Sequence, residues 1–193
     1  MKTTLKYAVA AVALMAGVNA ATAAGEHIPA VTDYANANIK SWISDKAVVE
    51  AIKAQNAENA SLAQGDIDAL DQKWRAGVDG GATAMIAEVL GNSLSGFLRD
   101  KQMASNGVIT EIFVTDDKGL NVGQSDVTSD YWQGDEAKWQ KTYGSGGEAV
   151  FVDGVEQDES TQMLQSQASF TIVDPETGQP IGAATVGINL DKL

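Results

Sequence analysis

The chain has 193 residues, of which 44% are hydrophobic and 20% are charged, a balance that fits one folded domain. It has no cysteine and a single histidine, which excludes disulfides, thiolate metal sites, cysteine nucleophiles and multi-histidine metal centres. The 26 acidic residues against 13 basic ones give a formal charge of −13. Such a chain repels nucleic-acid phosphates and anionic membrane surfaces, so we expect no nucleic-acid partner and no membrane insertion.

Residues 1–24 have the three parts of a cleaved secretory signal. Lys2 and Lys6 provide the positive start, an apolar run of roughly a dozen residues follows, and Ala21-Thr22-Ala23 fits the small-residue cleavage pattern. The run is shorter than the roughly 20 residues that a membrane-spanning helix needs. The sequence therefore predicts a signal peptide over 1–24, a single mature domain over 25–193 and a periplasmic location.

The first half of the mature chain has the pattern of helices. Apolar side chains at three- and four-residue steps predict one long amphipathic helix over 29–58, a short helix over 66–75 and a third helix over 82–102. The glycine-rich stretch 77–81 is expected to separate the last two.

After Gly107 the hydrophobic pattern changes to that of strands. Strands are expected over 108–115, 120–124, 148–155, 162–173 and 180–189. Asp116-Asp117-Lys118-Gly119 has the composition of a tight turn between the first two. Helices followed by hairpin-linked strands predict an α+β domain with a five-stranded antiparallel sheet.

The long connection over 125–145 combines aromatic residues with carboxylates, and it contains two of the four tryptophans. Large rings are seldom left in an exposed loop, so this connection must fold back over something. One interpretation is a satellite core in which Asp135 only caps a short helix. The other is a lid over a ligand site, with aromatic walls and a carboxylate for a cationic or amino group: Tyr131, Trp132 and Trp139, with Asp130, Asp135 or Glu136.

The expected strand 162–173 alternates between two kinds of side chain. One face is largely apolar, and the other carries only amides and hydroxyls: Gln165, Gln167, Ser169 and Thr171. The polar face is either an ordinary solvated sheet surface or the floor of a polar ligand pocket beneath the lid.

Other chemistry has weaker support. The acidic turn over 153–159 could be a calcium site or a solvated turn, and its spacing is not that of an EF-hand. No motif points to a cofactor. With no cysteine and no histidine in the body of the fold, a hydrolase would have to use carboxylates, Ser, Thr, Tyr or Lys as base or nucleophile, and no acidic pair stands out. We therefore expect a protein that is not an enzyme.

Four segments together carry a family resemblance. They are the strand Glu111-Ile112-Phe113-Val114-Thr115-Asp116 with its turn at Gly119, the stretch Thr128-Ser129-Asp130-Tyr131-Trp132-Gln133-Gly134-Asp135-Glu136, the turn Asp158-Glu159-Ser160-Thr161, and the ending Val173-Asp174-Pro175-Glu176-Thr177-Gly178-Gln179-Pro180-Ile181-Gly182. In this order, after a long N-terminal helix, they resemble the single Cache sensor domains, also called PDC or PAS-like extracytoplasmic sensors. The resemblance covers about residues 31–193.

The resemblance implies a five-stranded antiparallel sheet with a long helix along one face and a ligand pocket on the other. The connection after the second strand would roof this pocket. On this sequence the resemblance implies the roof residues Tyr131, Trp132, Asp135 and Trp139. It implies the floor residues Gln165, Gln167 and Ser169. The family binds amino acids, amines and carboxylates, and the acidic lid here favours a ligand with an amino group.

Members of this family normally pass a signal across a membrane to a kinase or chemoreceptor output. Here the chain ends at Leu193, directly after its last strand, so we expect a free-standing sensor module that acts through a separate membrane sensor kinase or chemoreceptor. The alternative is a protein–protein adaptor with no ligand of its own, which docks through the N-terminal helix. That helix has apolar residues to spare and could also form a homodimer.

Overall fold

The computed structural model describes residues 25–81, 83–146, 150–157 and 164–193. The expected signal peptide, and Asp158 and Glu159 of the acidic turn, lie outside these residues. The helices are α1 (His27–Asn38), α2 (Lys40–Ile43), α3 (Lys46–Glu58), α4 (Gln64–Gly80), α5 (Ala84–Gly91), α6 (Ser93–Ala104) and α7 (Ala137–Gln140), with 3-10 turns η1 (Tyr143–Ser145) and η2 (Leu190–Lys192). The strands are β1 (Ile109–Thr115), β2 (Asn121–Gln124), β3 (Phe151–Gln157), β4 (Leu164–Val173) and β5 (Pro180–Asn189).

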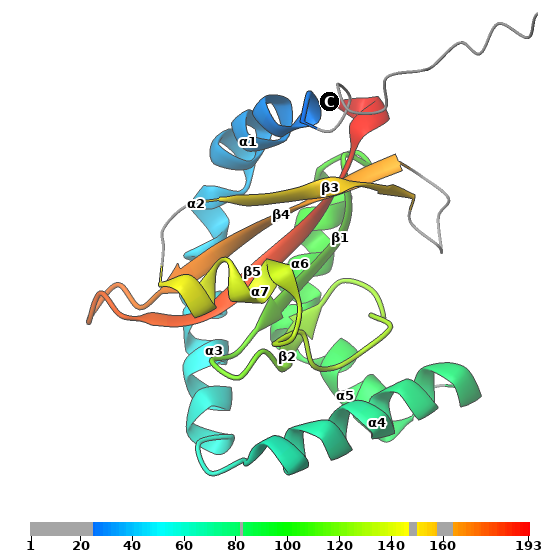
Figure 1. Ribbon diagram of the computed structural model, residues 1–193, viewed down its shortest axis with the longest axis vertical. Coiled ribbons are helices and arrows are strands. Elements are labelled where there is room, and N and C mark those ends of the chain that lie inside the picture. Colours follow the sequence, from blue (N-terminus) through cyan, green and yellow to red (C-terminus); the bar gives the residue numbers. More distant parts are fainter. Residues whose placement is uncertain (1–24, 82, 147–149, 158–163) are drawn as a thin grey trace, which may run out of the picture.

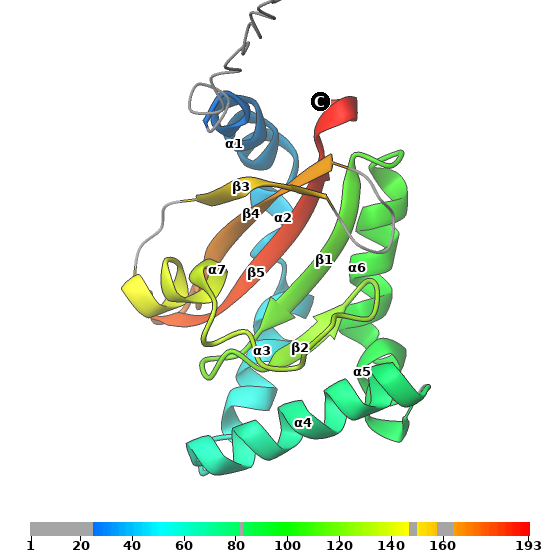
Figure 2. The ribbon, with the colours of Figure 1, turned by 45° about the vertical axis from the view of Figure 1, so that its right-hand side comes forward.

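The strands form one sheet in the order β2-β1-β5-β4-β3, and every neighbouring pair is antiparallel. Helices α1, α3 and α6 cover one face of this sheet (Figures 1 and 2). The α+β fold expected from the sequence, with N-terminal helices packed on a five-stranded antiparallel sheet, is confirmed.

The N-terminal helical region differs from the single helix that we expected over 29–58, because it is divided into α1, α2 and α3. Asp45 is responsible for the second break. Its backbone is extended and its side chain accepts a hydrogen bond from the N–H of Ala47 at 2.9 Å, so it caps the start of α3. The breaks allow α1 to pack against β4 and β3 while α3 packs against β5.

The two following helices also differ from expectation. Helix α4 continues through the glycine-rich stretch to Gly80, and Gly81 follows as its C-cap with a φ of 101°, which favours glycine. The expected helix over 82–102 is instead divided at Asn92, whose side chain accepts a hydrogen bond from the N–H of Ser95 at 2.8 Å and starts α6. The longer α4 reaches past the end of the sheet and supports the connection after β2.

Two hydrophobic cores hold these elements together. The main core lies between the helices and one face of the sheet, and its fully buried residues include Ile39, Ile52, Leu98, Ile112, Val186 and Ile188. The second core joins α4 and α5 to the connection after β2, and consists of Ile67, Trp74, Ile86, Val89, Leu120 and Tyr131. The opposite face of the sheet, which carries the polar residues of β4, is left for the connection between β2 and β3 to cover.

Candidate functional site

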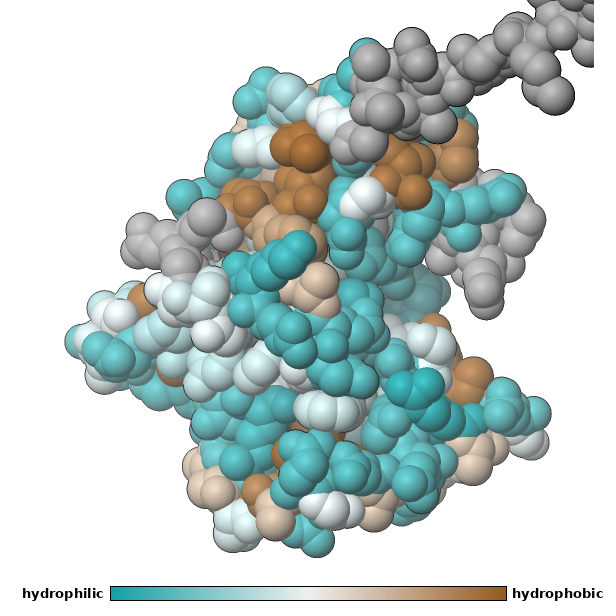
Figure 3. Space-filling view, viewed as in Figure 1, coloured by the Kyte–Doolittle hydropathy of each residue, from teal (hydrophilic) through white to brown (hydrophobic). Residues whose placement is uncertain are grey.

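A cavity of about 1010 Å³ lies on the sheet face opposite the helices. Its lining comes from β1 and β4, from the end of α6, and from the connection that follows β2. Figure 3 views the molecule from this side, where hydrophilic residues predominate and hydrophobic ones gather toward α1 and β3. The volume is sufficient for a small metabolite, which typically occupies a pocket of about 300–1,000 Å³.

The floor of the cavity is a network of polar side chains on β1 and β4. Glu111 Oε1 accepts hydrogen bonds from Gln167 Nε2 at 2.9 Å and from Gln165 Nε2 at 3.2 Å. Gln165 Oε1 in turn accepts from the hydroxyl of Thr110. Both glutamines are buried, with 1% and 8% exposure, so their amides hold the Glu111 carboxylate in a fixed position.

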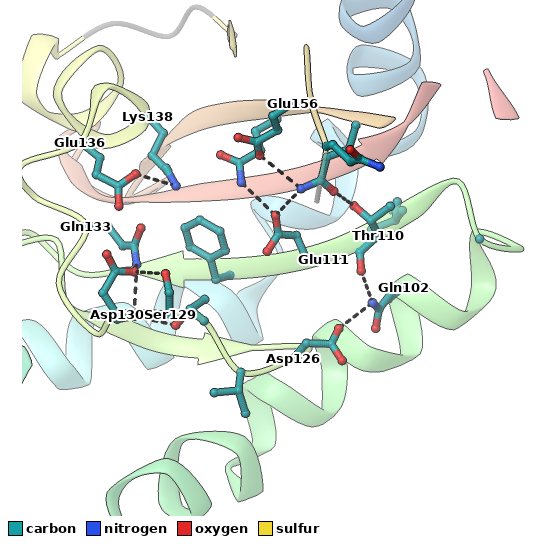
Figure 4. A pocket seen from close by; sticks show the side chains of 18 of the residues that line it. Gln102, Thr110, Glu111, Asp126, Ser129, Asp130, Gln133, Glu136, Lys138 and Glu156 are labelled. Atoms are coloured by element: carbon teal, nitrogen blue, oxygen red, sulfur yellow. Dashed lines mark hydrogen bonds and ion pairs between the residues drawn. The ribbon is translucent and has the colours of Figure 1, made fainter. Parts of the chain in front are cut away.

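One end of the cavity is built from the connection after β2 (Figure 4). The Asp130 carboxylate accepts hydrogen bonds from Gln133 Nε2 at 2.7 Å and from the Ser129 hydroxyl at 3.2 Å. Beside it, Lys138 Nζ lies 2.7 Å from Glu136 Oε2. The same ammonium stands over the ring of Phe113, 5.2 Å from its centroid, which adds a cation–π contact with the floor.

The other end is formed by α6, β3 and the start of β1. Gln102 Nε2 donates to Asp126 Oδ2 at 2.7 Å and to the carbonyl of Thr110 at 2.6 Å, so α6 joins this wall to the floor. Glu156 Oε1 accepts from Gln165 Nε2 at 3.3 Å. Lys192 contributes an ammonium group that donates to the carbonyl of Asn106 at 3.2 Å.

Burial changes the acidity of one carboxyl in this lining. The pKa of Glu136 is raised above its ordinary value, first because burial disfavours the charged form and then because Asp130 is nearby. The ion pair with Lys138 opposes this shift and does not overcome it. Outside the lining, burial also raises the pKa of the Tyr131 hydroxyl, so this phenol stays protonated.

Asp130 and Glu136, two of the possible lid carboxylates, line the cavity. Of the seven roof and floor residues that the resemblance implied, Gln165 and Gln167 line its floor. The other five are placed elsewhere among the described residues. Tyr131 stacks on Trp74 in the second core, with ring centroids 5.3 Å apart, and Ser169 is buried in a hydrogen bond with Thr185. A ligand contact by Tyr131 or Ser169 stays a prediction.

The remaining three lie in the connection itself. Trp132 Nε1 donates to the carbonyl of Lys118 at 2.8 Å, and Trp139 Nε1 donates to the carbonyl of Asp116 at 3.3 Å. Asp135 is exposed, and α7 begins after Glu136, so Asp135 is not its N-cap. These rings pack the connection onto the protein, and their role as ligand contacts also stays a prediction.

Sequence reasoning did not single out Glu111, Gln102, Asp126 or Lys138 as site residues. Glu111 had a usable signal, because it is the one charged residue of β1, a strand that lies between β2 and β5 inside the sheet. Gln102 and Asp126 gave none, since polar residues at a helix end and in a loop are ordinary. Among the described residues no cluster suits a metal ion, and Asp158 and Glu159 of the considered calcium turn are not among them.

Comparisons with known proteins find similarity in structure only. No protein-family model and no curated protein sequence matches the chain. The chain is similar in structure to sensor domains. One is the sensor domain of the V. cholerae histidine kinase DctB, with a TM-score of 0.47, 15% identity, and coverage of 85% of this chain and 51% of that one.

Two further similar structures are a ligand-binding domain and a sensor domain. The ligand-binding domain of the Campylobacter jejuni chemoreceptor Tlp3, in complex with 4-methylisoleucine, gives a TM-score of 0.42 and 12% identity, with coverage of 75% of this chain and 57% of that one. The E. coli DcuS sensor domain gives a TM-score of 0.37 and 16% identity, with coverage of 65% of this chain and 92% of that one. The chain spans about half of the DctB sensor domain. None of the described helices is both long enough and apolar enough to cross a bilayer.

Proposed function

We propose that this protein is a periplasmic sensor module that binds a small metabolite in the cavity between the sheet and the connection after β2. It acts through a separate membrane protein, a sensor kinase or a chemoreceptor, and carries out no reaction of its own. Its ligand belongs to the amino acids, amines or carboxylates. The sensor-domain descriptions of the similar structures fit this proposal, and the binding itself rests on the cavity.

The observation that carries the proposal is the organised polar floor beneath a cavity of metabolite size. An ordinary solvated sheet face carries side chains that point into water independently of one another. Here Glu111, Gln165 and Gln167 are joined by hydrogen bonds, and the two glutamines are nearly inaccessible. Fixed polar groups in a concave site reduce the entropy that a ligand must lose on binding, which is the usual design of a specific small-molecule site.

The direct test is a thermal-shift screen of the purified protein against amino acids, amines and carboxylates. A ligand of the folded state raises the unfolding free energy by about 2.7 kcal/mol when its concentration is 100 times the dissociation constant. Hits are then measured by isothermal titration calorimetry. If no compound in the three classes shifts the melting temperature, ligand sensing is rejected and the adaptor interpretation takes its place.

A blocking variant ties any hit to this cavity. Ser129 lines the cavity and is exposed, so Ser129→Trp places a large ring in the space and removes only one hydrogen bond, the 3.2 Å contact with Asp130. The matched control is Ser61→Trp, at an exposed serine outside the lining. We expect the first variant to lose binding and the second to keep it. Ligand-dependent co-purification of a membrane kinase or chemoreceptor tests the signalling step.

A further inference from the structure

Three exposed apolar side chains belong to the lining of the cavity. Among the described residues, seven large hydrophobic side chains are exposed, and three of them line this cavity: Val78, Met103 and Val127, with exposures of 40%, 68% and 46%. They come from the last turn of α4, the last turn of α6 and the connection after β2. Single exposed apolar residues need no explanation, whereas a group of them at a concave site marks an interaction. We call these three residues the apolar cluster.

Met103 and Val127 are brought together by the residues that precede them. Gln102 Nε2 donates to Asp126 Oδ2 at 2.7 Å, and Figure 4 shows this pair in the wall of the cavity. The same amide donates to the carbonyl of Thr110 at 2.6 Å, so the pair is also attached to the floor. The end of α6 and the connection after β2 are therefore held together at this point.

Val78 joins the apolar cluster through Trp74. The indole Nε1 of Trp74 donates to the carbonyl of Thr128, the residue after Val127, at 2.8 Å. Val78 follows Trp74 by four residues and lies one turn further along the same face of α4. The segment that carries Val127 is thus hydrogen-bonded to both helices, and the cluster is in place before any ligand binds.

The fold does not need these side chains for its stability. Neither hydrophobic core, as far as the described residues show, includes Val78, Met103 or Val127. Polar side chains at these exposed positions would cost little in folding and would leave less apolar surface in water. A molecule that covers the apolar cluster explains why the positions are apolar. Methionine suits such a contact, because its unbranched thioether adapts to different shapes.

We propose that the ligand is amphiphilic, with a hydrocarbon tail that lies on the apolar cluster and a polar head that faces the hydrogen-bonded floor. The occupant is the ligand and not a second protein, because the apolar cluster and the floor line one cavity and a single molecule covers both. Ile109 and Phe113, two apolar residues of β1, also line this cavity, so the floor itself offers apolar contact. This inference rests on the proposed function, because it names the ligand class of the same site.

The test measures how affinity changes with the length of the tail. The probes are straight-chain primary amines, carboxylates and 2-amino acids of about two to eight carbons, which share their tails and differ in their heads. Isothermal titration calorimetry gives the affinity of each. In the series whose head fits the floor, we expect each added methylene to raise the affinity about two- to fourfold, because it leaves water for an apolar contact.

Variants of the apolar cluster locate the tail. The double variant Met103→Gln with Val127→Thr makes two of its positions polar at nearly constant size. The matched control is Leu164→Gln with Val155→Thr, at side chains that are 48% and 45% exposed and lie outside the lining. We expect the first double variant to reduce the gain per methylene and to lower the affinity of the eight-carbon probe about tenfold or more. The control should leave both quantities unchanged.

Several results would overturn the inference. Equal affinity at every chain length would do so, as would equal effects of the two double variants once thermal melts show that both fold. Failure of all three series also overturns it. If the cluster variant keeps the probe affinities and loses co-purification of a membrane protein, the apolar cluster contacts that protein and the tail assignment is wrong.

The broad metabolite screen separates this inference from the proposed function. If the three series fail and the screen still yields a ligand that Ser129→Trp excludes, only the amphiphilic class is wrong. If that screen also yields nothing, the proposed function fails with it.

Discussion

Asp71 Oδ1 accepts the backbone N–H of Tyr131 at 2.9 Å, although 60 positions separate the two residues along the chain. The same oxygen accepts the N–H of Trp132 at 3.1 Å, and Asp71 Oδ2 accepts from Arg75 Nε at 2.6 Å. Arg75 then reaches Asp130 in the cavity lining. A single buried carboxylate on α4 therefore fixes both the backbone of the connection and the cation that orients a cavity residue.

We predict that Asp71→Asn lowers the free energy of unfolding by about 1.5–3 kcal/mol, because hydrogen bonds to a charged acceptor are replaced and Arg75 loses its partner. Urea denaturation followed by tryptophan fluorescence measures the change. Asp68→Asn is the control, since Asp68 lies on the same helix but is exposed, and its effect should stay within about 0.5 kcal/mol. Equal effects of the two variants would contradict the anchoring role of Asp71.

Trp74 is the centre of the second core, and its removal should loosen the connection. The side chain is fully buried, stacks on Tyr131, and donates from Nε1 to the carbonyl of Thr128 at 2.8 Å. We predict that Trp74→Ala costs about 3–5 kcal/mol of stability, as for other large aromatic residues in cores. Trp74→Phe keeps an aromatic ring, smaller than the indole, and loses the hydrogen bond, so its cost should be smaller, about 1–3 kcal/mol. A cost for Phe as large as that for Ala would indicate that stacking contributes little.

Much of the fold could be predicted because it depends on local pattern. The change of hydrophobic period after Gly107 marks where helices give way to strands, and the alternation in β4 assigns Gln165 and Gln167 to the face that bears the cavity. The breaks at Asp45 and Asn92 depend on single capping hydrogen bonds. Apolar spacing continues across both positions, so the pattern alone indicated uninterrupted helices.

The site was less predictable, because its residues come from elements distant in sequence. Tyr131 and Trp132 were rightly expected to fold back onto the protein, but the presence of aromatic residues does not indicate which element they pack against. Their direction is set by Asp71 and Trp74 on α4. Both residues lie within the expected helix over 66–75, but its local pattern does not indicate which segment they contact. Likewise, Gln102 meets Asp126 only because α6 runs beside the start of β1.

The turn between β1 and β2 depends on glycine. Gly119 has a φ of 83°, and a Cβ there would stand 2.6 Å from the backbone Cα and N of Gly134, with no flexible group to move aside. We predict that Gly119→Ala lowers stability by about 1–3 kcal/mol. Gly65→Ala is the matched control, because a Cβ at this position in α4 meets nothing within 4 Å. It should leave stability unchanged or raise it by up to about 1 kcal/mol, and thermal melts of both variants decide the matter.

Glu136 predicts a specific dependence of stability on pH. Because its pKa is raised in the folded state, the folded protein holds this proton more firmly than the unfolded chain. The stability associated with the group is therefore fully present below the ordinary pKa of 4.5 and is lost as the pH rises through the raised value. Glu136→Gln removes this titration while keeping the shape of the side chain.

The measurement is the difference in unfolding free energy between the wild type and Glu136→Gln across pH 4 to 8. Other carboxyls contribute to both proteins, so the difference isolates this group, including its contacts with Lys138 and Asp130. We expect the wild type to lose stability relative to the variant as the pH rises, by about 1.4 kcal/mol for each full pKa unit between the folded and unfolded states. A gain instead of a loss would mean that the attraction of Lys138 outweighs burial, and that the pKa of Glu136 is lowered.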